Sequence, residues 1–158
     1  MQWARNCVAC NGGRVLDIGC NTGEMFDGMD GVANFMGVDM EEFQLPSAYN
    51  LGFKIADAEE LPFEDKEFHL SVLSEVIEHV KNPVKAMSEA IRVADRVLIT
   101  TPNEYNWDAS NLPFHNDSHI RYYRTDTLLK DLGDAGVRVL LFKQLNYDGW
   151  SFFTVIGR

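Results

Sequence analysis

Short apolar segments alternate with stretches of helical periodicity along this chain, and this alternation limits the folds open to it. Strands are predicted over Arg14–Gly19, Ala33–Asp39, Phe53–Ala56, His69–Ser74, Arg96–Thr101, Arg138–Leu145 and Ser151–Ile156. Helices are predicted over Thr22–Met29, Pro83–Val93 and Thr125–Ala135. The pattern is typical of a mostly parallel sheet that helices cover on both faces.

The last two predicted strands have no helix between them. Asn146 and the pair Asp148–Gly149 have the composition of a hairpin connection, so the last strand is predicted to run antiparallel to its neighbour. A chain of 158 residues with 46% hydrophobic content can build one core, and it shows no repeat or low-complexity tract. We therefore predict a single domain over residues 1–158.

Charge and composition restrict the partners. The net charge of −10 disfavours nucleic acid as a ligand and favours a cationic one. No apolar stretch is long enough for a membrane span, and no basic segment followed by an apolar one opens the chain, so a cytoplasmic protein is expected. Three cysteines do not suggest a disulfide framework, and Cys7–Cys10 lacks the second pair that a structural zinc site needs.

The segment Val15–Gly23 is an apolar strand that enters a glycine-containing turn. Glycine lets a ligand approach the backbone at such a strand end. Cys20 stands between Gly19 and Gly23, so the dinucleotide fingerprint fails, and the lysine of a phosphate-binding loop is also missing. Because Asp17 would repel phosphate, the turn suits a ligand with a cationic group.

Two further acids end the next two predicted strands. Asp39 closes the second strand and could accept hydrogen bonds from a ribose diol. Asp57 closes the third strand and could hold an exocyclic adenine amine. Together with Asp17, these carboxylates are predicted to meet at one edge of the sheet.

These residues resemble the motifs of class I S-adenosylmethionine-dependent methyltransferases, in particular the type 11 and ubiquinone-pathway-like group. Val15–Gly23 resembles the first motif, with Asn21 in place of a glycine, and Ser74–Val80 resembles the segment after the fourth strand. The resemblance implies a Rossmann-like α/β three-layer sandwich, with a mostly parallel seven-stranded sheet and an antiparallel last strand. It also implies S-adenosylmethionine as cofactor, with these binding residues: Asp17, Gly19, Cys20, Asn21, Gly23, Asp39, Met40, Asp57, Ala58 and Ser74.

The acceptor is predicted to be a hydroxyl of a small molecule. Methyltransferases that act on base amino groups carry Asn/Asp-Pro-Pro-aromatic after the fourth strand, where this chain has Ser74–Ile77. The long segment Glu104–Arg124 is rich in aromatics and histidines and is expected to cover the acceptor. His119 and His115 are the candidate general bases, because imidazole titrates near neutral pH.

Two alternatives stay open. Glu75, Glu78 and His79, with His119 or His115, resemble the magnesium ligands of RNA 3′-terminal 2′-O-methyltransferases. The motif at Ile120–Tyr123 departs from that family and the charge is acidic, so no metal is predicted. The other alternative is a non-catalytic S-adenosylmethionine-binding module. Homodimerisation is left undecided by the sequence.

Overall fold

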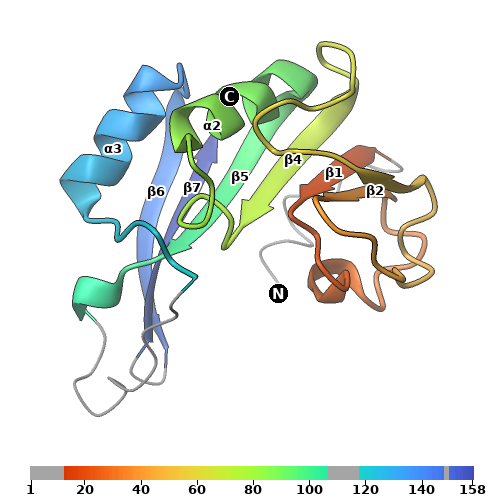
Figure 1. Ribbon diagram of the computed structural model, residues 1–158, viewed down its shortest axis with the longest axis horizontal. Coiled ribbons are helices and arrows are strands. Elements are labelled where there is room, and N and C mark those ends of the chain that lie inside the picture. Colours follow the sequence, from red (N-terminus) through yellow and green to blue (C-terminus); the bar gives the residue numbers. More distant parts are fainter. Residues whose placement is uncertain (1–12, 107–117, 148–149) are drawn as a thin grey trace.

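The computed structural model describes residues 13–106, 118–147 and 150–158, and these form an α/β domain around a seven-stranded sheet (Figure 1). The elements follow in the order β1 (Arg14–Ile18), η1 (Glu24–Phe26), β2 (Asn34–Asp39), β3 (Gly52–Ile55), β4 (Phe68–Ser74), α2 (Pro83–Val93), β5 (Ala94–Pro102), η2 (Glu104–Asn106), α3 (Thr125–Asp134), β6 (Val139–Tyr147) and β7 (Trp150–Gly157).

The strands lie in the order β3-β2-β1-β4-β5-β7-β6. β1 pairs in parallel with β2 and β4, and the parallel arrangement continues to β3 and β5. β7 is antiparallel to both β5 and β6. The prediction of a mostly parallel sheet with an antiparallel last strand is confirmed, although the turn at 148–149 lies outside the described residues.

Helix α2 begins and ends where the sequence predicts. The side chain of Asn82 accepts a hydrogen bond from the Lys85 amide at 3.0 Å, and Pro83 occupies the first turn, where its missing N–H costs nothing. Apolar residues recur on one side of the helix, so that Met87 and Ala90 are fully buried in the main core. The helix ends at Val93, and β5 follows at once.

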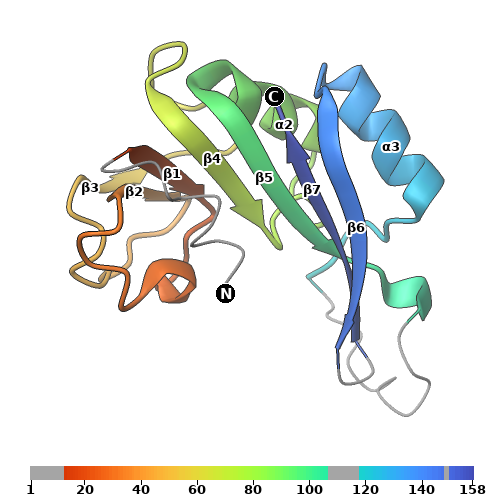
Figure 2. The ribbon, with the colours of Figure 1, turned by 180° about the vertical axis from the view of Figure 1, so that it is seen from behind.

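Helices α2 and α3 cover the same face of the sheet, as the two opposite views show (Figures 1 and 2). The other face carries a second apolar cluster, in which Phe26, Met29 and Tyr49 pack with Phe35 and Val72. On this face the covering layer comes from η1 and the irregular connections after β1 and β2. Among the described residues, no helix has the length and apolar composition that a membrane crossing requires.

The predicted helix over Thr22–Met29 is wrong. The segment forms only the short 3-10 turn η1, Glu24–Phe26. Gly23 and Gly28 have φ of 78° and 70°, left-handed values that a right-handed helix cannot continue through. Buried Phe26 and Met29 supply the apolar spacing that suggested a helix.

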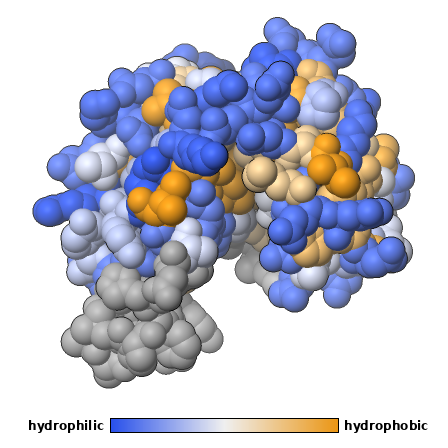
Figure 3. Space-filling model, in the orientation of Figure 1, coloured by the Kyte–Doolittle hydropathy of each residue, from blue (hydrophilic) through white to orange (hydrophobic). Residues whose placement is uncertain are grey.

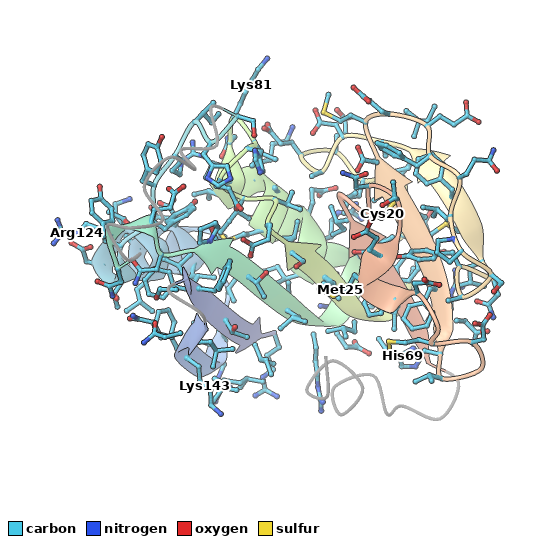
Figure 4. The ribbon with its side chains drawn as sticks, turned by 90° about the horizontal axis from the view of Figure 1, so that it is seen from below. Cys20, Met25, His69, Lys81, Arg124 and Lys143 are labelled. Carbon is cyan, nitrogen blue, oxygen red and sulfur yellow. The ribbon has the colours of Figure 1, made fainter. Side chains whose placement is uncertain are left out.

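The carboxyl ends of the parallel strands meet at one edge of the sheet. Ile18 lies beside Val38, Asp39 beside Ile55 and Ser74 beside Thr100. Figure 4 views the molecule from this edge, with Cys20 and Met25 over the end of β1 and Lys81 extending outward. The connections that leave these strand ends therefore build any site at this edge.

Candidate cofactor and acceptor site

The turn after β1 is shaped by left-handed backbone at Gly19 and Asn21, whose φ values are 70° and 45°. The Gly19 and Cys20 amides both donate to the Val38 carbonyl, at 2.8 and 3.1 Å, which fixes the turn to the end of β2. A Cβ on Gly19 would lie 2.6 Å from Cγ2 of Val76. Glycine is therefore required here by both conformation and packing.

Asp39 holds the next part of the site together. Its Oδ2 accepts a hydrogen bond from the Asn21 amide at 2.9 Å, so the carboxylate connects the end of β2 to the glycine turn. The side chain also lines a cavity of about 480 Å³. Met40, Asp57 and Ala58 line the same cavity, as the cofactor prediction requires.

A second cavity of about 370 Å³ lies on the other side of the turn and shares the walls Gly19 and Asn21 with the first. Asp17, Cys20 and Ser74 also line it. Nine of the ten predicted cofactor residues thus border two adjoining cavities. Such a pair of cavities suits a ligand with two dissimilar halves.

Gly23 is the exception, because it borders neither cavity. A Cβ at this position would lie 2.7 Å from Pro46 Cδ and 2.8 Å from Tyr49 Cε2. Packing against the connection of residues 41–51 therefore accounts for glycine at this position without a bound ligand.

Asp17 is a buried carboxyl, only 2% exposed, and the Tyr49 hydroxyl donates a hydrogen bond to its Oδ2. Burial raises the pKa of Asp17 to about 7, and the charge of Asp39 adds to the rise, while the hydrogen bond from Tyr49 opposes it. The second cavity therefore has an acidic wall whose charge changes near neutral pH.

Two more carboxyls follow β4, one half-buried and one buried. Glu75 has a positive φ of 56° and its Oε1 accepts from the Thr100 hydroxyl at 2.7 Å. Glu78 is 1% exposed, and its Oε2 accepts from the Thr101 hydroxyl at 3.0 Å. Burial raises the pKa of Glu75 to about 7 and that of Glu78 to about 8. Within residues 13–106, 118–147 and 150–158, Glu78 Oε1 has no hydrogen-bond partner.

Two histidines complete this cluster. The His79 and His119 rings meet edge to face, with centroids 4.7 Å apart. His119 Nδ1 lies 2.8 Å from Glu104 Oε1, and both side chains are nearly buried. His79 Nε2 is 4.0 Å from Glu78 Oε1, but burial lowers the pKa of His79 and raises that of Glu78, so the contact is not an ion pair near neutral pH. Side-chain ligand atoms of Glu78, His79 and His119 lie within 4.8 Å of one another.

The cluster adjoins the larger cavity, which Glu75 and His79 help to line opposite Asp39 and Asp57. Glu75, Glu78 and His79 have the i, i+3 and i+4 spacing of one helix face, but residues 77–79 form a turn. They still converge, because the turn closes through a His79 amide bond to the Val76 carbonyl at 2.9 Å.

Comparison with known proteins decides the family. The methyltransferase domain family matches residues 16–96, just over half of the chain. The chain belongs to this family. It is a class I S-adenosylmethionine-dependent methyltransferase by fold and motifs, and S-adenosylmethionine is its cofactor.

The similar proteins align with different fractions of this methyltransferase. A ubiquinone biosynthesis O-methyltransferase of Aromatoleum aromaticum is 26% identical over 94% of the chain and 74% of its own length. An uncharacterized protein of Methanocaldococcus jannaschii is 37% identical over 53% of the chain, and the match spans only 40% of that protein. A SAM-dependent methyltransferase structure from Archaeoglobus fulgidus superposes with a TM-score of 0.69 at 19% identity, covering 99% of this chain and 90% of that one; this likeness shows the fold alone.

Of the candidate bases of this methyltransferase, His119 lies in the cluster and His115 lies outside the described residues, as do Cys7 and Cys10. Sequence reasoning did not identify Tyr49, or Glu104 as the partner of His119. Glu104 sits just after the predicted fifth strand, so its place at the common sheet edge was a usable signal. For Tyr49 no such signal exists, because it lies in an irregular connection.

Proposed function

We propose that this methyltransferase transfers the methyl group of S-adenosylmethionine to a hydroxyl of a small molecule. The observation that carries the proposal is the His119–Glu104 pair, because the His119 ring contacts His79, which lines the larger cavity. A hydroxyl must lose its proton when it is methylated, and a carboxylate-paired imidazole is suited to take it.

The cofactor supplies an activated sulfonium methyl, and the chain's residues hold and orient it. In the larger cavity Asp39 would accept hydrogen bonds from the ribose hydroxyls, and Asp57 and Ala58 would border the adenine. In the smaller cavity Asp17 would bind the ammonium group of the methionine half. Gly19 and Asn21, which line both cavities, would hold the part of the cofactor that joins the two halves.

The proton leaves through His119. Glu104 Oε1 lies 2.8 Å from Nδ1 and can accept a hydrogen bond from it, which would place the imidazole proton on Nδ1 and the basic lone pair on Nε2. This pairing also fixes the plane of the ring. The base is therefore oriented before the acceptor arrives.

A small acceptor is supported by charge and by one relative. The net charge of −10 opposes the approach of a polyanion such as nucleic acid. The Aromatoleum aromaticum relative is named for O-methylation in ubiquinone biosynthesis, which is consistent with a small hydroxylated acceptor. We propose a phenolic or sugar hydroxyl as the acceptor class, in the cytoplasm.

A panel of phenols, catechols and sugars, incubated with S-adenosylmethionine, tests the proposal. We expect acceptor-dependent formation of S-adenosylhomocysteine and a methyl ether that mass spectrometry detects.

His119→Ala should lower kcat about 100-fold, the low end of general-base contributions, with the KM for the cofactor unchanged. Glu104→Gln should lower kcat less than Glu104→Ala does, because an amide oxygen can still accept a hydrogen bond from Nδ1. Unchanged turnover in His119→Ala would contradict the assigned base.

A second candidate is a divalent cation at the same cluster. The ligand atoms of Glu78, His79 and His119 lie close together, and a buried carboxylate oxygen of Glu78 has no partner among the described groups. Carboxylate and imidazole donors fit a cation such as Mg²⁺ or Mn²⁺. Glu78, His79 and His119 would hold it, and it would favour ionisation of a bound hydroxyl. This candidate suits the RNA 3′-terminal 2′-O-methyltransferase alternative.

Thermal denaturation with and without the cation distinguishes the two candidates. If a cation binds, Mn²⁺ raises the melting temperature of the wild type near pH 8 but not that of Glu78→Gln. A chelator then abolishes turnover, and an oligoribonucleotide with a free 3′-terminal 2′-hydroxyl is methylated while its 2′-deoxy counterpart is not. Turnover that survives chelation assigns the cluster to proton transfer alone.

A further inference from the structure

Tyr49 is buried beneath the glycine turn, although it belongs to an irregular connection. Its ring lies 6.0 Å from the Phe35 ring and 6.3 Å from the Phe26 ring. Its amide donates to the Pro46 carbonyl at 3.0 Å, and its carbonyl accepts from Gly52 at 2.9 Å. The connection thus fixes both the ring and the backbone of this residue.

The surrounding glycines make room for this ring. A Cβ on Gly37 would lie 3.3 Å from Tyr49 Cδ1, and one on Gly23 would lie 2.8 Å from Cε2. One position within β2 and one directly before η1 therefore lack side chains where the tyrosine packs. The packing aims the hydroxyl at the carboxyl of Asp17.

Apart from Tyr49, the described groups that face Asp17 are acidic or neutral. Asp39 approaches from the end of β2, the Cys20 thiol from the glycine turn, and Glu24 borders the same cavity from η1. Ser74 lines the cavity from β4 and bonds to Thr100. Among these groups Tyr49 supplies the hydrogen bond that favours the carboxylate over the acid.

We propose that Tyr49 is a positioning residue that keeps Asp17 ionised and aimed into the smaller cavity, so that Asp17 can bind the cofactor's ammonium group. The inference rests on the proposed placement of the methionine half beside Asp17. Without the tyrosine hydroxyl, Asp17 would take up a proton more readily, since burial already raises its pKa to about 7. Binding an ammonium group would then require that proton to be expelled.

Calorimetric titration of the full chain with two ligands tests this role. S-adenosylhomocysteine carries the ammonium group, whereas 5′-methylthioadenosine lacks the whole amino-acid part. Tyr49→Phe keeps the ring and should weaken S-adenosylhomocysteine binding about tenfold near pH 7, the loss expected for a hydrogen bond to a charged group. Binding of 5′-methylthioadenosine should not change. This loss of affinity should become smaller as the pH rises from about 6 to about 8, because Asp17 then ionises more readily even without the tyrosine hydroxyl.

Tyr123→Phe is the matched control. Tyr123 is also a buried tyrosine, and its hydroxyl donates to Asp131 at 3.2 Å, but it borders neither cavity. This variant should bind both ligands as the wild type does.

Equal weakening of both ligands by Tyr49→Phe, no weakening, or a loss that is constant with pH would each overturn the inference. Asp17→Asn separates this failure from failure of the site. If Asp17→Asn weakens only S-adenosylhomocysteine while Tyr49→Phe has no effect, Asp17 binds the ammonium group and the role of Tyr49 alone is wrong. If Asp17→Asn also has no effect, the placement of the methionine half is wrong.

Discussion

A buried carboxyl such as Glu78 links stability to pH. Its pKa rises from an ordinary 4.5 to about 8 on folding because of burial, so the folded chain binds more protons than the unfolded chain between these values. The free energy of unfolding must then fall as the pH rises from about 5 to about 8. Glu75 and Asp17, whose pKa values rise to about 7, act in the same direction.

Glu78→Gln should therefore flatten this pH dependence. The neutral amide keeps the shape of the side chain and removes the ionisation. The melting temperature of the variant should therefore fall less than that of the wild type between about pH 5 and about pH 8. Thermal denaturation in a chelating buffer, monitored by circular dichroism at each pH, measures this melting temperature. The exposed Glu64→Gln is the control and should follow the wild type. Parallel curves for Glu78→Gln and the wild type would refute the shift.

Gly19 permits a second prediction at single-residue scale. Gly19→Ala introduces a Cβ 2.6 Å from Val76 and a strained φ, so it should destabilise the fold by about 2 kcal/mol or more. Gly28 has the same φ of 70° but open space around it, so Gly28→Ala should cost only about 1 kcal/mol. Urea denaturation of both variants gives the difference. Equal costs would mean that Val76 moves aside freely.

At the residue scale, site residues that directly follow strands could be predicted from the sequence, whereas those in irregular connections could not. Asp39 and Asp57 were predictable because parallel strands bring their carboxyl ends to one edge. Tyr49 was not, because its contact with Asp17 depends on the path of a connection without regular structure. Gly23 was assigned to the ligand, although packing against Pro46 and Tyr49 explains it.

At the scale of elements, the segment that carries His119 is fastened to the turn after β4. The Ile120 amide donates to the Glu78 carbonyl at 3.1 Å. Arg121 Nη1 donates to the carbonyls of Ile77 and Val80, at 3.1 and 2.9 Å. Its Nη2 reaches the Lys81 carbonyl at 3.2 Å. One guanidinium thus holds the histidine segment against the acidic turn.

Arg121→Ala should loosen that attachment while sparing the cofactor cavities. We expect kcat to fall about tenfold or more with S-adenosylhomocysteine binding unchanged, because a displaced base is poorly aligned with the acceptor. The nuclear Overhauser effect between the His79 and His119 rings, 4.7 Å apart, should disappear. Lys130→Ala removes an exposed cation from α3 and should alter neither quantity. A persistent ring–ring signal would contradict the role of Arg121.

Regular elements were predicted well where one physical signal dominates. Helix α2 has a proline start, an asparagine cap and an apolar stripe, and its bounds agree with the prediction. The predicted helix at Thr22–Met29 had apolar spacing but also glycines that adopt left-handed backbone at both ends of the short 3-10 turn. Periodicity alone could not reveal that conformation.

At the scale of the whole molecule, the parallel strands deliver acids to one sheet edge and the sequence carries a net charge of −10. The face in Figure 3 is largely hydrophilic, with apolar groups scattered among polar ones. Exposed Met40 and Ile55 lie near the larger cavity, and Ile120 and Leu129 lie on the α3 side. A cofactor with a net positive charge matches the negative charge of this sheet edge better than a phosphate ligand does.

Calorimetric titration with S-adenosylhomocysteine, comparing the wild type with Asp39→Asn, tests this account most directly. Asp39 borders the larger cavity and ties the glycine turn to β2, and its side chain is only half-buried, so the isosteric substitution should be tolerated in folding. The wild type should bind one equivalent, and Asp39→Asn should bind at least about tenfold more weakly. No binding by the folded wild type at millimolar ligand, or equal affinity in the two proteins, would contradict the placement of the cofactor at this sheet edge.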